Sequence, residues 1–356
     1  MDNEKCLLPI WESELVYRET MAMILEKDVC SAAFARRPER IVCVESYDGT
    51  CLYEEGKDFI IEESRLIITP DSRIPCAGWE AFFYTDEAKA KADNPDIGFG
   101  PVATSDGRFL NLHAIDNPEY VTRFQISVTY TTREKWEGFC PESGLRNLPR
   151  LGEKLLKKEK ISVLLYGDSI SCGFDCSSHY GLAPNQPKWY DLVVEALEKR
   201  SGCKVELKNI SQAGMNTDWA IENARQRMGD FRPDLTILGF GMNDRVCGSQ
   251  YREKTKALME AVKAVCPETE FLLIATTLPI ELADTPPIYF TSHQDEYSDE
   301  LGKLCEEGVA LADVQRFQKA LLAKKRYIDM TGNWLNHPND YLCRIQAQVV
   351  NTALGG

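Results

Sequence analysis

Four short segments in the second half of the chain hold residue types that can do chemistry together. The first, Gly167-Asp168-Ser169-Ile170, places a serine directly after an apolar run, where a strand-to-helix turn would expose its hydroxyl as a nucleophile. The last, Asn336-His337-Pro338, supplies an imidazole, which titrates near neutral pH and suits a general base. These two segments indicate nucleophilic catalysis, with Ser169 as the nucleophile and His337 as the base.

The other two segments offer hydrogen-bond donors for a developing negative charge. Ser211-Gln212-Ala213-Gly214 ends in a glycine, whose backbone N–H a bound group can approach closely. Gly241-Met242-Asn243-Asp244 provides the side-chain amide of Asn243, a neutral donor. With the N–H of Ser169 at a helix start, these donors can form an oxyanion hole. Each segment alone is better explained as a turn or a helix cap, so the inference rests on all four together.

All four segments follow predicted strands or precede a predicted helix. From about residue 148, apolar strands are predicted at 161–166, 204–208, 235–240 and 271–275. Helices are predicted at 188–200, 217–228, 251–265, 297–307 and 314–324, with a last one after Pro338. Strands that alternate with helices predict a parallel sheet covered on both faces. Reactive groups then lie in loops beyond the carboxyl ends of the strands.

The first part of the chain has a different pattern. Short strands separated by turn residues are predicted at 40–46, 58–61, 65–69 and 124–131. Such spacing is typical of an all-β sandwich, jelly-roll-like in its strand order. The segment 88–100 has no strong periodicity and is expected to be a loop. We therefore predict a β-sandwich accessory domain at 1–145 and an α/β catalytic domain at 146–356, joined through the turn-rich stretch 137–144.

The order of the four segments resembles the SGNH (GDSL-type) hydrolase superfamily, whose blocks are a G-D-S, a Gly, a G-x-N-D and a His near the C-terminus. The resemblance covers about residues 161–350 and implies a three-layer α/β fold and serine esterase chemistry. The resemblance implies that Ser169 and His337 are the catalytic residues. It also implies an oxyanion hole formed by Ser169, Gly214 and Asn243, and supporting roles for Asp168 and Asp244.

The chain departs from this superfamily at one position. The superfamily usually has an Asp three residues before the His, where it orients the imidazole, and this chain has Trp334 there. Some carbohydrate esterases of the superfamily work as a Ser–His dyad, so we expect a backbone carbonyl to accept the second imidazole N–H. Asp329, Asn333 and Asp340 are the alternatives. Two further residues are expected to line the pocket, Trp334 and His179.

The layout of the whole chain is similar to that of bimodular acetyl-carbohydrate esterases of the family 2 type, and the stretch 47–59 looks like their front module. The resemblance implies an acetylesterase that removes O-acetyl or other short acyl groups from carbohydrates. Two alternatives stay open. One is a lipase or lysophospholipase-type acyl hydrolase, and the other is a non-catalytic carbohydrate-binding protein on a hydrolase scaffold.

Composition limits the partners. A net charge of −14 argues against nucleic acid, which needs clustered Lys and Arg. The 13 cysteines include no C-x-x-C pair, so we expect free thiols in a reducing compartment and no metal or other cofactor. The N-terminus lacks a secretion signal and the apolar runs are short, which favours a cytoplasmic protein without membrane contact. The expected partner is an acylated small molecule or oligosaccharide, and the oligomeric state is left open.

Overall fold

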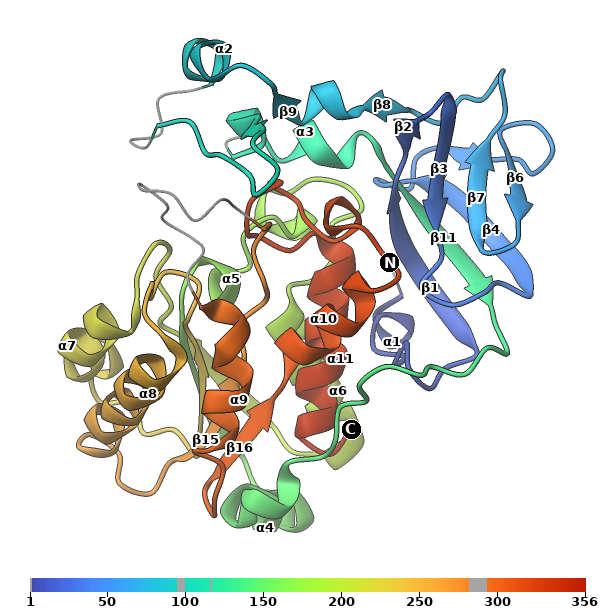
Figure 1. Cartoon of the computed structure of the whole chain (residues 1–356). Coiled ribbons are helices and arrows are strands. Elements are labelled where there is room, and N and C mark those ends of the chain that lie inside the picture. The colour runs from blue at the N-terminus through green and yellow to red at the C-terminus, as the bar shows by residue number, and fades with distance from the viewer. Residues whose placement is uncertain (1, 95–99, 116, 282–292) are drawn as a thin grey trace.

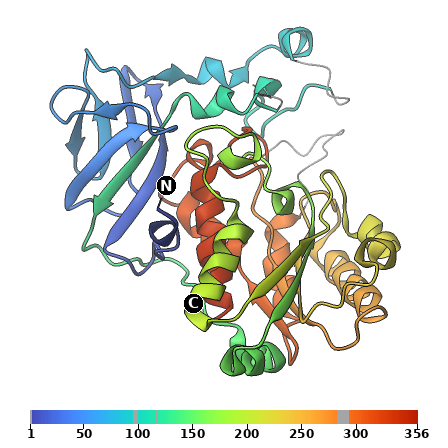
Figure 2. The same cartoon turned by 180° about the vertical axis from the view of Figure 1, so that it is seen from behind.

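The computed structural model describes residues 2–94, 100–115, 117–281 and 293–356. Figures 1 and 2 show an N-terminal region of mostly antiparallel sheets beside a C-terminal domain built on one parallel sheet. This arrangement confirms the fold class predicted from the sequence. The domain boundary at residue 145 stays a prediction.

The N-terminal region contains two larger sheets, and its edge carries a small two-stranded one. The first sheet has the order β1 (Leu15–Ala22), β11 (Gln125–Thr131), β4 (Arg40–Ser46) and β5 (Leu52–Tyr53). The second has the order β6 (Phe59–Glu62), β7 (Arg65–Ile68), β3 (Val29–Ala33), β2 (Ile24–Glu26) and β8 (Ala77–Gly78). The small sheet pairs β9 (Phe83–Tyr84) with β10 (Phe109–Leu110), and the helices are α1 (Asn3–Cys6), α2 (Glu87–Asp93) and α3 (Glu119–Thr122).

The C-terminal domain has three layers. Its parallel sheet has the order β13 (Val205–Asn209), β12 (Ile161–Gly167), β14 (Leu235–Gly239), β15 (Glu270–Ile274) and β16 (Val309–Ala312). Its helices are α4 (Pro149–Lys157), α5 (Ser169–Cys172), α6 (Trp189–Ser201), α7 (Thr217–Met228), α8 (Gly248–Lys263), α9 (Tyr297–Gly302), α10 (Val314–Leu322) and α11 (Asp340–Ala353). Helices α6 and α11 cover one face of the sheet, and α7 and α8 cover the other (Figure 1).

The residue pattern of β12 explains why both faces are covered. Val163 and Leu165 belong to the apolar cluster shared with α6 and α11, whereas Leu164 and Tyr166 belong to the cluster shared with α7 and α8. Side chains alternate across a strand, so an unbroken apolar run must be buried on both sides. The packed layers on both faces thus fix the position of the end of β12, and the turn that carries Ser169 follows directly.

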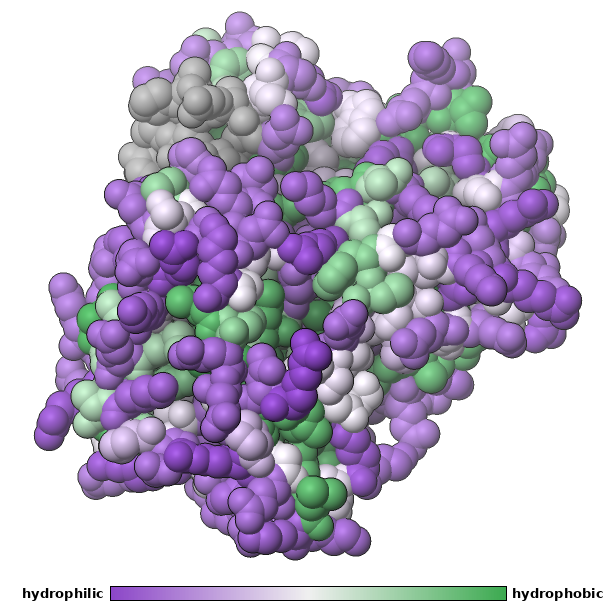
Figure 3. All heavy atoms as spheres, turned by 60° about the horizontal axis from the view of Figure 1, so that its bottom comes forward, coloured by the Kyte–Doolittle hydropathy of each residue, from purple (hydrophilic) through white to green (hydrophobic). Residues whose placement is uncertain are grey.

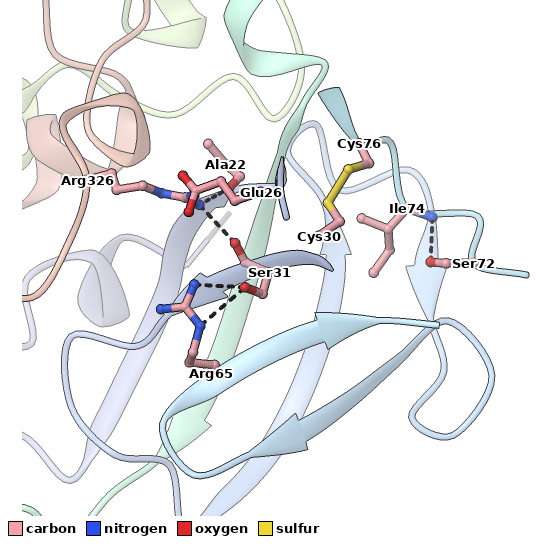
Figure 4. The surroundings of a disulfide bond; sticks show 9 residues. All are labelled: Ala22, Glu26, Cys30, Ser31, Arg65, Ser72, Ile74, Cys76 and Arg326. Atoms are coloured by element: carbon pink, nitrogen blue, oxygen red, sulfur yellow. Dashed lines mark hydrogen bonds and ion pairs between the residues drawn. A yellow bond between two sulfur atoms is a disulfide. The ribbon is translucent and has the colours of Figure 1, made fainter. Parts of the chain in front are cut away.

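Two expectations about the N-terminal region are wrong. The segment 88–100 was expected to be a loop, but its described part contains most of α2, whose N-cap Asp86 accepts a hydrogen bond from the N–H of Lys89. The cysteines were expected to be free, but Cys30 and Cys76 form a disulfide (Figure 4). A spacing of 46 positions gives no local signal for this pair. The cytoplasmic location stays a prediction, and this disulfide counts against the thiol argument behind it.

The surface agrees with the acidic, charged composition. The face drawn in Figure 3 is mostly hydrophilic, with hydrophobic residues in small groups between polar ones. Within the described ranges, the chain contains no helix that is both long enough and apolar enough to cross a membrane.

Candidate active site

The nucleophile turn is built by residues that neighbour Ser169 in sequence. At its N-terminus, α5 is capped by Asp168, whose carboxylate accepts the N–H of Ile170 at 3.0 Å. Gly167 and Gly239 lie side by side in β12 and β14, and a Cβ on Gly167 would come within 2.4 Å of the Gly239 carbonyl oxygen. The glycine therefore lets the strands close up where the chain turns, and Ser169 stands at the carboxyl end of the sheet.

Ser169, His337 and Asp175 form a continuous hydrogen-bonded chain. The imidazole Nε2 of His337 lies 2.8 Å from the Ser169 hydroxyl, and its Nδ1 lies 2.6 Å from a carboxylate oxygen of Asp175. The structure thus brings together the predicted serine and histidine. The expectation of a backbone carbonyl on the second nitrogen is wrong, because a carboxylate occupies that position.

Asp175 reaches the histidine because α5 is a single turn. The helix ends at Gly173 in the left-handed conformation (φ +84°), and Asp175 itself has φ +60°, a region that Asp tolerates better than most side chains. The loop of His337 approaches closely, since a Cβ on Gly332 would lie 2.6 Å from the Cβ of Asp175. The sequence signal that could have identified Asp175 is a Gly-x-Asp directly after the single helical turn that begins at the nucleophile.

The three alternatives considered for this role have other hydrogen-bond partners. Asn333 accepts the N–H groups of Leu335, Asn336 and His337, each at 3.0 Å, and so shapes the turn that carries the histidine. Asp329 accepts the N–H of Ala22, and Asp340 accepts the N–H of Ser177. These side chains satisfy backbone donors that the turns leave unpaired.

Trp334 was expected to line the pocket, but it packs against the N-terminal region instead. Its side chain is 3% exposed and contacts the rings of Trp79, Phe82 and Phe83. Its indole N–H donates to the carbonyl oxygen of Phe82 at 3.1 Å. The tryptophan has φ +64°, which is costly for a bulky residue, so the surrounding structure holds the turn in this form.

His179 lies near the triad through an intervening ring. The Phe174 ring packs at a tilt against His179, with ring centroids 4.4 Å apart, and against His337, with centroids 5.5 Å apart. Burial lowers the pKa of His179, and the positive charge of Lys188 acts in the same direction. A half-buried imidazole thus lies near the triad, and its place in the lining of the substrate pocket stays a prediction.

The predicted oxyanion donors lie in the loops after β12, β13 and β14. Gly214 has φ +76°, and neither its N–H nor that of Ser169 donates to a protein acceptor within the described residues. Asn243 donates one amide hydrogen to the carbonyl oxygen of Met215 at 3.1 Å. An amide nitrogen carries two hydrogens, so the second stays available.

The two supporting aspartates are buried carboxyls. Burial raises the pKa of Asp168 to about 7, although the N–H of Ile170 and the nearby His337 act in the opposite direction. Burial also raises the pKa of Asp244, whose carboxylate accepts the N–H of Thr217 at 3.0 Å and so joins the loop after β14 to the start of α7.

The segment that carries His337 is bonded to the N-terminal sheets. The side-chain amide of Gln125 in β11 donates to the carbonyl oxygens of Ile328 and Thr331 at 2.6 and 3.0 Å, and its oxygen accepts from Asn339 at 3.1 Å. A buried ion pair joins Lys325 to Glu19 of β1 at 2.6 Å. Both partners are inaccessible to solvent, so loss of either would leave a buried charge unpaired.

A second group of contacts ties the same segment to the end of β1 and to β3. The Arg326 guanidinium donates to the carbonyl oxygens of Ala22 and Ser31, beside the Cys30–Cys76 disulfide (Figure 4). Sequence reasoning missed all of these contacts because they join residues far apart in the chain.

The described residues give no indication of a metal centre. Nowhere in those ranges do three or more His, Cys, Asp or Glu side chains gather so that they could hold a metal ion. The groups that the structure brings together at this site are a serine hydroxyl, an imidazole and a carboxylate, the equipment of a serine hydrolase.

The comparison with protein families agrees with this class. The model of the GDSL-like lipase/acylhydrolase family matches residues 165–343, just over half of the chain. The chain belongs to this family and is therefore a carboxylic ester hydrolase. No match is found among the curated proteins.

Several solved structures are similar to the chain. A two-domain esterase (CEX) active on acetylated mannans has 16% sequence identity and a TM-score of 0.47, and the match covers 61% of this chain and 54% of that one. A catalytic mutant of an acetylxylan esterase from Geobacillus stearothermophilus has 17% identity and a TM-score of 0.44, with 55% and 94% covered. The match thus spans about half the length of the two-domain esterase.

Proposed function

We propose that the chain is a serine esterase that removes acetyl or other short acyl groups from carbohydrates, with Ser169, His337 and Asp175 as its catalytic triad. One observation carries the proposal. Each nitrogen of the His337 imidazole has its own partner, the Ser169 hydroxyl at 2.8 Å and the Asp175 carboxylate at 2.6 Å. This pattern selects the tautomer that can take the serine proton.

The reaction proceeds in two halves. Ser169 attacks the ester carbonyl as His337 takes its proton, and Asp175 stabilises the imidazolium that forms. The imidazolium then gives the proton to the leaving hydroxyl oxygen, which leaves an acyl-enzyme on Ser169. Water, deprotonated by His337, attacks that ester, and the acid and free serine are released.

The negative oxygen of each tetrahedral intermediate is held by hydrogen bonds. The proposed donors are the N–H groups of Ser169 and Gly214, which have no acceptor among the described residues, and the second amide hydrogen of Asn243. Such donors act most strongly where water is excluded, and Ser169 is 5% exposed. Removing one donor of this kind typically costs about 10²–10³ in turnover.

Three observations favour a sugar ester over the alternatives. The pocket that borders Asp175 carries Asp48, Glu119 and Arg123, charged groups that can bind the hydroxyls of a sugar. The complete triad disfavours a non-catalytic binding protein. The two-part layout, with sheets preceding the hydrolase domain, also resembles that of acetyl-carbohydrate esterases.

A comparison of substrates tests the proposal. The enzyme should hydrolyse p-nitrophenyl acetate with a much higher kcat/KM than p-nitrophenyl palmitate, and it should release acetate from acetylated oligosaccharides. Faster turnover of the palmitate ester would support the lipase alternative. Absence of hydrolysis with every ester would support the binding protein.

A further inference from the structure

A pocket lies between the N-terminal sheets and the loop that carries Asp175. Its volume is about 240 Å³, and its walls come from the turn between β4 and β5, from α3 and from the segment 175–183. Asp175 belongs both to this pocket and to the triad. The pocket is therefore linked to Ser169 through the imidazole of His337 and its two hydrogen bonds.

The rim of this pocket carries a charged pair whose members do not bond each other. Glu119 and Arg123 are four positions apart, a spacing that normally lets a carboxylate and a guanidinium pair. Within the described residues, neither side chain makes an ion pair or a hydrogen bond. The Arg123 guanidinium instead lies over the rings of Tyr120 and Phe124, 4.6 Å from each centroid, which holds its plane and leaves its N–H groups unused.

The other walls of this pocket contain aromatic rings and polar groups that can bind hydroxyls. Tyr53 and Tyr47 form part of the wall, and the Asp48 carboxylate accepts from Ser46 and Thr50. Tyr180 borders the pocket and donates its hydroxyl to the Asp175 carboxylate at 3.1 Å. Three carboxylates face one guanidinium, so the pocket disfavours anions.

We infer that this pocket is an accessory binding site for a neutral sugar unit of the substrate, an inference that rests on the proposed carbohydrate esterase function. A sugar ring offers adjacent hydroxyls, each of which can accept from Arg123 and donate to Glu119 or Asp48. A volume of about 240 Å³ lies just below the range of about 300–1,000 Å³ that is usual for ligand pockets, so the pocket fits one ring better than a lipid chain. The occupant would be a sugar near the acetylated one in the same oligosaccharide.

The kinetic test compares Arg123→Ala with Arg133→Ala, a control whose side chain is 82% exposed and paired with Glu39. Substrates are p-nitrophenyl acetate, an acetylated monosaccharide and longer acetylated oligosaccharides. Arg123→Ala should lower kcat/KM about tenfold on the longer substrates, through KM, because a hydrogen bond to a charged group is lost. It should leave the first two substrates unchanged. Equal losses on all substrates, or none on the long ones, would overturn the inference.

A binding measurement separates this inference from the proposed function. Ser169→Ala protein is titrated calorimetrically with unacetylated manno- and xylo-oligosaccharides, and the titration is repeated with Ser169→Ala/Arg123→Ala. The inference requires binding that the second change weakens about tenfold. Wild-type protein that hydrolyses p-nitrophenyl acetate but no acetylated sugar would refute the carbohydrate substrate. Undetected binding, or binding that Arg123→Ala leaves unchanged, would refute the pocket even where acetylated sugars are hydrolysed.

Discussion

The loops that carry Ser169 and His337 reach the same site by different routes. The Ser169 turn is fixed by its own neighbours, the cap Asp168 and the adjacent Gly167. The His337 loop is shaped locally by Asn333, but it is placed by contacts with the N-terminal sheets, such as the bond from Gln125 to Ile328, 203 positions away. The nucleophile thus belongs to the α/β domain alone, whereas the base depends on both parts of the chain.

This difference means that the N-terminal region helps to position a catalytic residue. The position where the superfamily usually has the triad Asp is occupied by Trp334, which anchors the loop to Phe82. The carboxylate is supplied by Asp175, on the nucleophile side of the site. One loop therefore supplies two members of the triad, and the other brings only the base.

The largest effect is expected at the locally built loop. Ser169→Ala removes the hydroxyl that is 2.8 Å from His337 and should lower kcat on p-nitrophenyl acetate by roughly 10⁶. Ser249→Ala, at an exposed serine of α8, is the control and should keep normal turnover. Circular dichroism checks that both variants fold. Near-normal turnover by folded Ser169→Ala protein would rule out this nucleophile.

The next effect distinguishes a triad from a dyad. Asp175→Asn keeps the shape but removes the charge that selects the histidine tautomer, so kcat should fall by about 10⁴. Asp299→Asn, whose side chain is 75% exposed, is the matched control. A fall of less than about tenfold would mean that a main-chain acceptor serves His337 after all.

The same contrast explains what could be predicted from the sequence. The runs that became β12, β14 and β15 are mostly apolar, and the turn after β12 contains its own cap and glycines, so the position of Ser169 after a strand could be predicted. Strand β16 was missed because Val309–Ala312 is only four residues long and lies between two segments predicted as helices. Asp175 was missed because a left-handed residue in an irregular loop has no periodicity. Its partner is 162 positions away.

A smaller effect is expected where the N-terminal sheets hold the base. Gln125→Ala removes two donated hydrogen bonds and one accepted bond, and it leaves the buried carbonyl oxygens of Ile328 and Thr331 without this donor. Each such loss costs about 1–3 kcal/mol, which should lower the denaturation midpoint. If the loop then shifts, kcat should fall by about 10- to 100-fold with little change in KM.

The control for this variant is Gln250→Ala, an exposed glutamine of α8. The comparison of the two loops would fail if Gln125→Ala lowered stability but left kcat at the wild-type value. In that case the N-terminal sheets would stabilise the fold without positioning His337.

The last prediction concerns the pH dependence of stability at the locally built loop. Burial raises the pKa of Asp168 to about 7 in the folded protein, whereas an unfolded Asp titrates near 3.8. Between these values the folded state binds more protons than the unfolded state, so this group makes the free energy of unfolding fall as pH rises from about 4 to about 7.

Asp168→Asn removes the titration and should flatten that part of the curve relative to wild type. Urea denaturation at a series of pH values measures the free energy of unfolding of both proteins. Burial also raises the pKa of Asp244 and of Asp340, but both proteins contain these residues, so their contributions cancel in the difference between the two free energies. Parallel curves for the two proteins would mean that Asp168 titrates at its ordinary pKa, and the turn would then hold a charged cap rather than a protonated one.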